Sequence, residues 1–235
     1  MSLYTVQPTD LLPHLHSPEG LYMEECTDLE LLAFMGSTTV EDVAHRMAND
    51  HVAYMAYYNS VPAAFGWMAR GKARIGELAH EIILPVGNRY LWNFRTLEAF
   101  RGLGIYPALL HYIIRNEKEK ATRFWIIHAP ENKASLKGIV KAGFHYVGTL
   151  YSKNGMALIG AAQASVETRD LLHEMDIAFS EEQPASCWNC SSPFLKKRKP
   201  ECCCAASQTE CTVNYLSSLL PVKSHTWLHQ FMYSN

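Results

Sequence analysis

The chain has 235 residues, 48% hydrophobic and 19% charged, a composition typical of a soluble globular protein with a sizeable core. Its 21 basic and 23 acidic residues give a formal net charge of −2, which excludes a global positive field for attracting nucleic acid or an anionic membrane. No apolar run approaches the ~18 residues of a membrane span, and no signal-like leader opens the chain. We therefore expect a cytoplasmic protein with no nucleic-acid or membrane partner.

The first part of the chain predicts an arm followed by two short helices. Residues 1–20 carry three prolines and no hydrophobic periodicity, so we expect a loop or a loosely packed arm there. Helical spacing follows in residues 28–35 and 39–47, and Gly36 and Ser37 separate the two helices.

Three strand candidates come next, at residues 51–58, 63–69 and 75–84. The connections between them, residues 59–62 and 71–74, have lengths that suit an antiparallel meander.

The stretch from 89 to 117 organises the chain. Residues 89–97 have the aromatic and β-branched bias of a strand, and the leucines and isoleucines of 109–114 repeat with helical spacing. Between them, Arg101-Gly102-Leu103-Gly104 predicts a sharp turn that leaves backbone N–H groups uncovered at the positive end of the helix dipole. Such a turn is a site for a phosphate or pyrophosphate. Pro107 fits the first turn of the helix, where a missing N–H costs little.

A second strand and helix complete a βαβ unit. Residues 123–129 form an apolar run typical of a strand that is buried on both faces. A helix then begins near Asn132 and ends at Gly143, and a final strand covers 144–151. A helix is also predicted over 166–179. We expect one domain over residues 1–160 and a helical, cysteine-rich extension over 161–235.

Six of the seven cysteines lie in the extension, between residues 187 and 211. Two close pairs at this separation are typical of a zinc ribbon, with candidate ligands Cys187, Cys190, Cys202 and Cys204. His225 and His229 are alternative ligands, and unligated thiols on a flexible tail are the competing interpretation. The basic run Lys196-Lys197-Arg198-Lys199 is read as a solvated loop or a phosphate contact.

The residues from Thr96 to Ile105 resemble the acyl-CoA-binding motif of the GNAT N-acetyltransferase superfamily, written Arg/Gln-x-x-Gly-x-Gly/Ala. Arg101 and Gly104 match, while Tyr106 stands where the family has Gly or Ala. A second block, residues 131–144, is similar to the family's Asn-x-x-Ser/Ala helix that closes with Gly-Phe. The resemblance covers about residues 40–151. It implies a mixed, mostly antiparallel α/β sheet with a central βαβ unit and flanking helices.

The resemblance also implies the residues that bind acetyl-CoA or another acyl-CoA. The backbone of Thr96 and Leu97 would contact the pantetheine arm, and Asn132 would face it. The pyrophosphate would lie on the turn formed by Arg101, Gly102, Leu103, Gly104 and Ile105, with Tyr106 beside it. Asn132 and Ser135 also suit a helix cap and a first-turn polar residue.

Direct attack of an amine on the thioester requires a proton acceptor and a proton donor. Glu77 and Glu81 share one face if their strand is regular, with His80 on the other, so a carboxylate there is a candidate base acting through water. Surface charge on a sheet edge is the competing interpretation. The family's proton-donating tyrosine is replaced by Ile139, so Tyr151 is the candidate acid.

Tyr146 and Tyr106 are further substitutes for that acid, and a packing role is the competing interpretation for all three tyrosines. The thiolate could also leave unassisted into water. His128, at the end of a buried strand, is a further candidate base. The predicted function is transfer of an acetyl or other acyl group from CoA to an amine of a small molecule or peptide. The alternative, which Ile139 and Tyr106 favour, is a non-catalytic acyl-CoA-binding or zinc-containing interaction module. The acceptor and the oligomeric state, a homodimer included, stay open.

Overall fold

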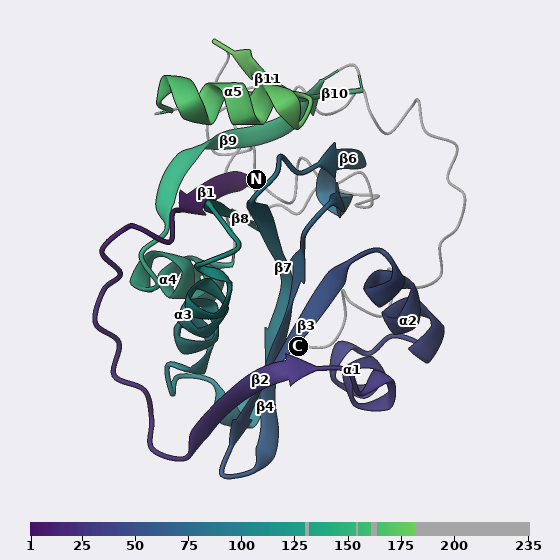
Figure 1. Cartoon of the computed structure of the whole chain (residues 1–235), viewed down its shortest axis with the longest axis vertical. Coiled ribbons are helices and arrows are strands. Elements are labelled where there is room, and N and C mark those ends of the chain that lie inside the picture. The colour runs from purple at the N-terminus through teal and green to yellow at the C-terminus, as the bar shows by residue number, and fades with distance from the viewer. Residues whose placement is uncertain (130–131, 154, 161–163, 182–235) are drawn as a thin grey trace, which may run out of the picture.

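The structure, a computed structural model, describes residues 1–129, 132–153, 155–160 and 164–181 (Figure 1). Its strands are β1 (Ser2–Val6), β2 (Leu21–Cys26), β3 (His51–Tyr58), β4 (Val61–Ala69), β5 (Lys72–Ile75), β6 (His80–Ile83), β7 (Asn88–Thr96), β8 (Arg123–His128), β9 (His145–Lys153), β10 (Met156–Gly160) and β11 (Ile177–Ser180). Its helices are α1 (Leu29–Gly36), α2 (Val40–Ala48), α3 (Ile105–Glu117), α4 (Lys133–Lys141) and α5 (Val166–Glu174). No described helix has the length and apolar character that a bilayer crossing requires.

Nine strands form one sheet in the order β11-β10-β9-β1-β8-β7-β4-β3-β2, and β5 and β6 form a separate pair. Neighbours in the large sheet are antiparallel except β7 with β8 and β10 with β11. The strand, helix and strand β7-α3-β8 lie at its centre. The predicted mixed, mostly antiparallel fold with a central βαβ unit is therefore confirmed.

Helices cover both faces of the sheet (Figure 1). On β3, Tyr54 packs with α3 whereas its neighbour Met55 packs with α1 and α2, because successive side chains of a strand point to opposite faces. On β8, Phe124 faces α3 and α4, while Trp125 faces α5 and the β5-β6 pair. The sheet thus separates an α3-α4 side from an α1-α2 side.

The N-terminal prediction was wrong, because residues 2–6 form a strand inside the sheet. β1 pairs antiparallel with β8 on one edge and with β9 on the other. Leu3 and Val6 are 3% and 1% exposed, so this short segment is core rather than arm. Five residues show too little alternation to predict a strand by themselves, and the pairing with two longer strands supplies the stability. β2 was also missed.

Two further elements differ from the sequence prediction. The strand expected over 75–84 is broken by a 3-10 turn at Gly76–Leu78, and Ala79 has a left-handed φ of 51°. The helix expected over 166–179 ends at Glu174, after which Asp176 has a φ of 56° and β11 pairs parallel with β10. In both cases a left-handed residue reverses the local direction, and sheet pairing takes over from local preference. α5 and β11 therefore pack on the same sheet as the rest.

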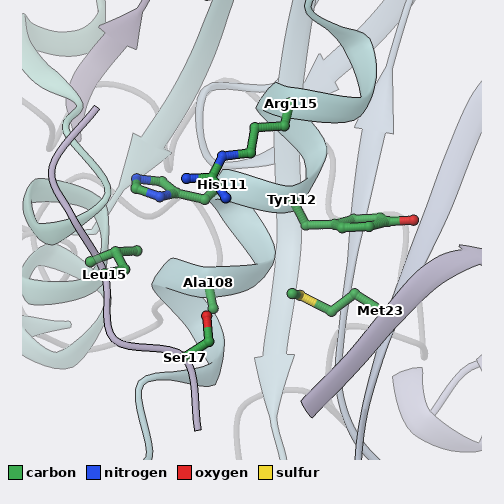
Figure 2. A pocket seen from close by; sticks show the side chains of 7 residues that line it. All are labelled: Leu15, Ser17, Met23, Ala108, His111, Tyr112 and Arg115. Atoms are coloured by element: carbon green, nitrogen blue, oxygen red, sulfur yellow. The ribbon is translucent and has the colours of Figure 1, made fainter. Parts of the chain in front are cut away.

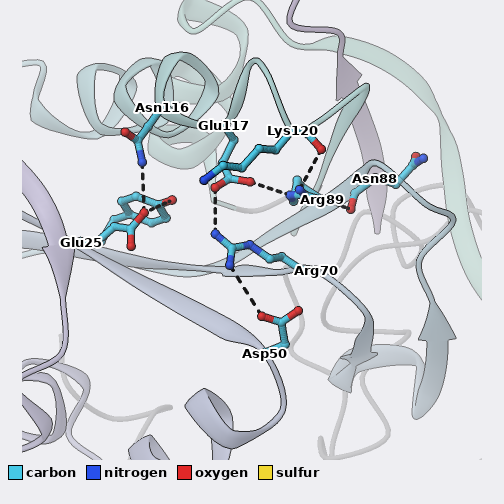
Figure 3. Close-up of polar contacts among 9 residues, drawn as sticks. Glu25, Asp50, Arg70, Asn88, Arg89, Asn116, Glu117 and Lys120 are labelled. Atoms are coloured by element: carbon cyan, nitrogen blue, oxygen red, sulfur yellow. Dashed lines mark hydrogen bonds and ion pairs between the residues drawn. The ribbon is translucent and has the colours of Figure 1, made fainter.

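A buried ion cluster fixes the C-terminal end of α3 (Figure 3). The Glu117 side chain is fully buried and accepts bonds of 2.8 Å from both Arg70, which directly follows β4, and Arg89 on β7. Arg89 also donates to the carbonyl oxygen of Lys120 at 2.9 Å. Burial alone would raise the pKa of Glu117, but the hydrogen bonds from Arg89 and Arg70 outweigh it and lower that pKa.

We predict that Glu117→Gln lowers the free energy of unfolding by about 3 kcal/mol, because two guanidinium groups lose their shared carboxylate in a buried site. Urea denaturation measures this. Glu119→Gln is the matched control, since Glu119 is 82% exposed in its pair with Lys118, and its effect is expected below ~0.5 kcal/mol. Equal midpoints for the two variants would contradict the account of the cluster.

The same cluster predicts a pH dependence. A carboxylate whose pKa is lowered on folding stabilises the protein above its unfolded value, here 4.5, and that stabilisation is lost as the pH falls through the folded value. The difference in unfolding free energy between the wild type and Glu117→Gln should therefore narrow below about pH 4. If the difference in unfolding free energy stayed constant down to about pH 3, this explanation would be contradicted.

Candidate active site

The two parallel strands at the centre of the sheet pair over only four residues each. Residues 88–91 of β7 face residues 123–126 of β8, and the register then stops. β7 continues to Thr96 against β4 alone. Beyond Leu91, the edge of β7 that faces β8 therefore has no strand partner in the described part of the chain, and its backbone groups are available to a ligand.

β7 carries a bulge where the pairing stops. Its register with β4 shifts between Phe65 and Trp67, and Asn93 has a left-handed φ of 52°. Such a bulge inserts an extra residue and re-aims the side chains around it. Trp92 packs on the α1-α2 side, whereas Phe94 lies over Gly66 and packs on the α3-α4 side.

The predicted glycine turn leads directly into α3. Gly102 and Gly104 have φ values of 85° and 79°, and a Cβ added to either would meet no atom within 4 Å. Gly104 is the N-cap of α3 and provides no side chain to bond the first N–H groups. Within the described residues, the N–H groups of 102–106 donate to no protein acceptor. The N-terminus of α3 is therefore an open anion site in both shape and charge.

Tyr106 does not fill this turn. Its ring lies against Gly138 of α4, and its centroid is 5.5 Å from that of Phe94. Burial raises the pKa of the Tyr106 hydroxyl to about 12, although a hydrogen bond with Ser135 lowers it in part. The bulky residue at the family's Gly or Ala position thus occupies the space between α3 and α4, where Gly138 makes room for it.

The other predicted binding residues lie around the same turn. Arg101 Nε donates to the Thr96 carbonyl at 3.4 Å, and Leu97 N–H donates to Ala63 O at 2.9 Å. Asn132 caps α4, since its Oδ1 accepts from Ser135 N–H at 3.0 Å. The predicted cap is confirmed. The contacts of these residues with an acyl-CoA stay predictions.

The sequence predicted that the candidate bases lie on a strand next to the central one, and this prediction was wrong. β6 pairs only with β5, where Glu81 is 67% exposed and lies 3.5 Å from Lys72 Nζ. The 3-10 turn at Gly76–Leu78 also removes the regular strand on which Glu77 and Glu81 were to share a face. His80 Nε2 donates to the Met175 carbonyl at 3.2 Å. None of these residues is held as a base beside the glycine turn at the start of α3.

The candidate acid, Tyr151, is 4% exposed on β9, and its hydroxyl has no hydrogen-bond partner among the described residues. β1 separates β9 from β8, so Tyr151 stands two strand spacings, about 10 Å, from β8. Tyr146 bonds Thr149 at 2.9 Å, and His128 Nε2 donates to Asn132 O at 3.0 Å. Ile139 is fully buried in the core between α3 and α4. The positions of these side chains do not test whether any of them acts as the acid or the base, so those roles stay predictions.

The predicted zinc ligands Cys187, Cys190, Cys202 and Cys204 lie outside the described residues, as do His225 and His229. Within the described ranges, no group of three or more His, Cys, Asp or Glu side chains is arranged to hold a metal ion.

A small cavity of about 80 Å³ lies farther along α3 (Figure 2). His111, Tyr112 and Arg115 line it from the helix, and Ser17 closes it from the N-terminal segment. His111 donates to Ala142 O at 3.1 Å, and burial lowers its pKa. The cavity is small and belongs to the outer face of α3, so it is distinct from the turn at the start of that helix.

No family model and no curated relative matches this chain. Among solved structures, it is similar to a GCN5-related N-acetyltransferase from Kribbella flavida, with 18% identity and a TM-score of 0.40 over 62% of this chain and 53% of that one. The chain thus spans about half the length of that protein. The ribosomal-protein-S18-alanine N-acetyltransferase from Escherichia coli matches with 16% identity and a TM-score of 0.45 over 57% of this chain and 83% of the other.

A predicted acetyltransferase from Clostridium acetobutylicum, solved with acetyl-CoA, matches with 15% identity and a TM-score of 0.41 over 57% of this chain and 96% of the other. These likenesses concern the fold, at low sequence identity and over part of the chain. For this chain the relevant features are its own: the split parallel pair, the bulge on β7 and the open glycine turn.

The packing of Tyr106 on Gly138 predicts a change of sign in a double-mutant cycle. Gly138→Ala should destabilise the protein by about 1–3 kcal/mol, because the added Cβ overlaps the Tyr106 ring. In a Tyr106→Ala background the same change should stabilise it by up to about 1 kcal/mol, through helix propensity alone. Urea unfolding of the four proteins measures the cycle. Equal effects of Gly138→Ala in both backgrounds would show that the Tyr106 ring does not pack against Gly138 of α4.

Proposed function

We propose that the protein is an acyl-CoA-dependent N-acetyltransferase acting on an amine of a small molecule or peptide. The observation that carries the proposal is the open N-terminus of α3 beside the point where β7 and β8 separate. The open N-terminus of α3 suits the diphosphate of a nucleotide thioester. The unpaired edge of β7 suits the extended pantetheine arm, which needs backbone hydrogen-bond partners. The two adjoin because α3 begins nine residues after Thr96.

Binding would draw on two kinds of donor. The N–H groups of 102–106 and the helix dipole favour a doubly charged diphosphate, and the glycines allow it to approach the backbone. The unpaired edge of β7 beyond Leu91 would bind the pantetheine arm as if the arm were a further strand. The backbone N–H and carbonyl groups of β7 would pair with the carbonyl and amide groups of the arm. This arrangement directs the thioester to the bulge at Asn93.

The reaction would be a direct transfer. The amine nitrogen forms a bond to the acyl carbonyl carbon, the carbon–sulfur bond breaks, the amine loses a proton to a base, and the thiolate takes one up. A backbone N–H at the bulge would stabilise the negative charge that develops on the carbonyl oxygen. Glu77 and Glu81 as bases and Tyr151 as acid stay predictions, and Glu81 would have to leave Lys72 to serve.

The test compares Gly104→Asp with Gly104→Asn in the full-length protein. Both side chains tolerate a left-handed conformation and they have nearly the same size, so both variants should fold alike. Only aspartate places a negative charge where the diphosphate would lie. We expect the Asp variant to bind acetyl-CoA about 100-fold more weakly than the Asn variant by calorimetry, from the loss of charge-assisted bonds and added repulsion. Equal affinities would refute the assignment of this turn.

A non-catalytic acyl-CoA binder is the second candidate, and the full burial of Ile139 at the family's tyrosine position favours it. Thiol release from acetyl-CoA with a panel of amines separates the two functions. Amine-dependent release supports the transferase, whereas thermal stabilisation by acetyl-CoA without any turnover supports the binder.

A further inference from the structure

A cationic and aromatic cluster lies on the α1-α2 side of the split between β7 and β8. The Arg46 guanidinium of α2 sits over two indole rings, 5.3 Å from the centroid of Trp67 and 5.0 Å from that of Trp92. The imidazole of His51 meets Trp92 edge-on at 5.3 Å. We call Arg46, Trp67, Trp92 and His51 the Arg46 cluster.

The charge of Arg46 is not neutralised by a bonded carboxylate. Within the described residues, the Arg46 guanidinium forms no ion pair and no hydrogen bond, although the backbone carbonyl of Arg46 accepts from Asn49 N–H at 3.0 Å. Burial lowers its pKa, and Asp42, which bonds Thr38 at 2.8 Å, exerts only a coulombic pull in the other direction. A guanidinium remains charged at neutral pH despite such a shift, so the cluster holds a half-buried cation.

Two buried polar atoms of the same cluster also lack partners. Trp92 Nε1 and His51 Nδ1 have no hydrogen-bond partner in the described part of the chain, although His51 Nε2 donates to Lys72 O at 2.8 Å. The indole nitrogen can only donate. Buried donors of this kind are costly unless a further group satisfies them.

The position of the cluster connects it to the proposed reaction. Trp92 directly follows Leu91, the last residue of β7 that pairs with β8, and precedes the bulge at Asn93. It packs on the α1-α2 side, opposite the side on which α3 would hold the diphosphate. An acceptor that reaches the thioester from the α1-α2 side of the sheet would therefore pass the Arg46 cluster.

Resting on the proposed function, we propose that the acceptor is an amine that carries a carboxylate, as in an amino acid or the C-terminal residue of a short peptide. Arg46 binds the carboxylate through its planar pair of N–H donors, while the two indoles hold the guanidinium in place from one face. Trp92 Nε1 supplies a further donor. The amine then lies toward the bulge, where the acyl carbon would be.

The neighbouring Arg95 does not compete for this role. Its Nη1 donates to Ser37 Oγ at 2.9 Å and to the Met35 carbonyl at 3.3 Å, which ties β7 to the turn between α1 and α2. It therefore positions the helix pair that carries Arg46, whereas Arg46 itself keeps its donors free of protein acceptors among the described residues.

The test is made on the full-length protein with matched ligands. Calorimetry with N-acetylglycine and N-acetylglycinamide, in the presence of CoA, compares a carboxylate with an amide of the same size, and neither ligand requires turnover. We expect the carboxylate to bind about 10- to 100-fold more tightly than the amide. Arg46→Gln should abolish that preference and Arg46→Lys should retain part of it.

Arg74→Gln is the control, since Arg74 is an exposed arginine on the β5-β6 pair and should leave the preference unchanged. Thermal melting confirms that each variant is folded. If an amine substrate is turned over, Arg46→Gln should raise KM for the amino acid by the same factor and leave KM for acetyl-CoA and for the carboxamide unchanged.

Equal binding of the two ligands by the wild type, no binding of either, or a preference that survives Arg46→Gln would each overturn the inference. The affinity for acetyl-CoA is measured separately. A protein that binds acetyl-CoA but shows no carboxylate preference refutes only the inference, and a protein that does not bind acetyl-CoA refutes the proposed function.

Discussion

The site depends on a single constraint, the separation of two adjacent parallel strands. α3 connects β7 to β8, and its C-terminal end is held at the paired end of these strands by the bonds of Glu117 to Arg70 and Arg89. With that end fixed and the strands paired over only four residues, the N-terminus of α3 comes to the open end of the pair. A helix dipole, free N–H groups and an unpaired strand edge therefore meet in one place, without any catalytic side chain being needed to bring them together.

In the proposed function, the two faces of the sheet have different roles, one in binding acyl-CoA and the other in binding the acceptor. The α3-α4 side holds the open turn, and Tyr106 packs into the space that Gly138 leaves rather than into the turn. The α1-α2 side presents Arg46 over its two indoles next to the bulge. Because a bulge re-aims neighbouring side chains, Trp92 and Phe94 serve opposite faces although only Asn93 lies between them.

Local sequence signals predicted the central part of the chain and failed where distant pairing decides structure. The glycine turn, α3 and the Asn132 cap have short-range causes, and each lies within a residue or two of its predicted place. β1 could not be predicted in the same way, because its five residues gain stability only between β8 and β9. The face shared by Glu77 and Glu81 failed because one 3-10 turn interrupts the expected strand. Arg46 was missed, since its partners Trp67 and Trp92 lie far away in sequence.

The most direct test of the central claim is calorimetry of the full-length protein with acetyl-CoA and with S-acetylpantetheine, which shares the reactive arm but lacks the diphosphate. We predict that acetyl-CoA binds about 100-fold more tightly, because several N–H groups at the start of α3 bond the diphosphate. Equal affinity for the two thioesters, or no binding of acetyl-CoA, would contradict it.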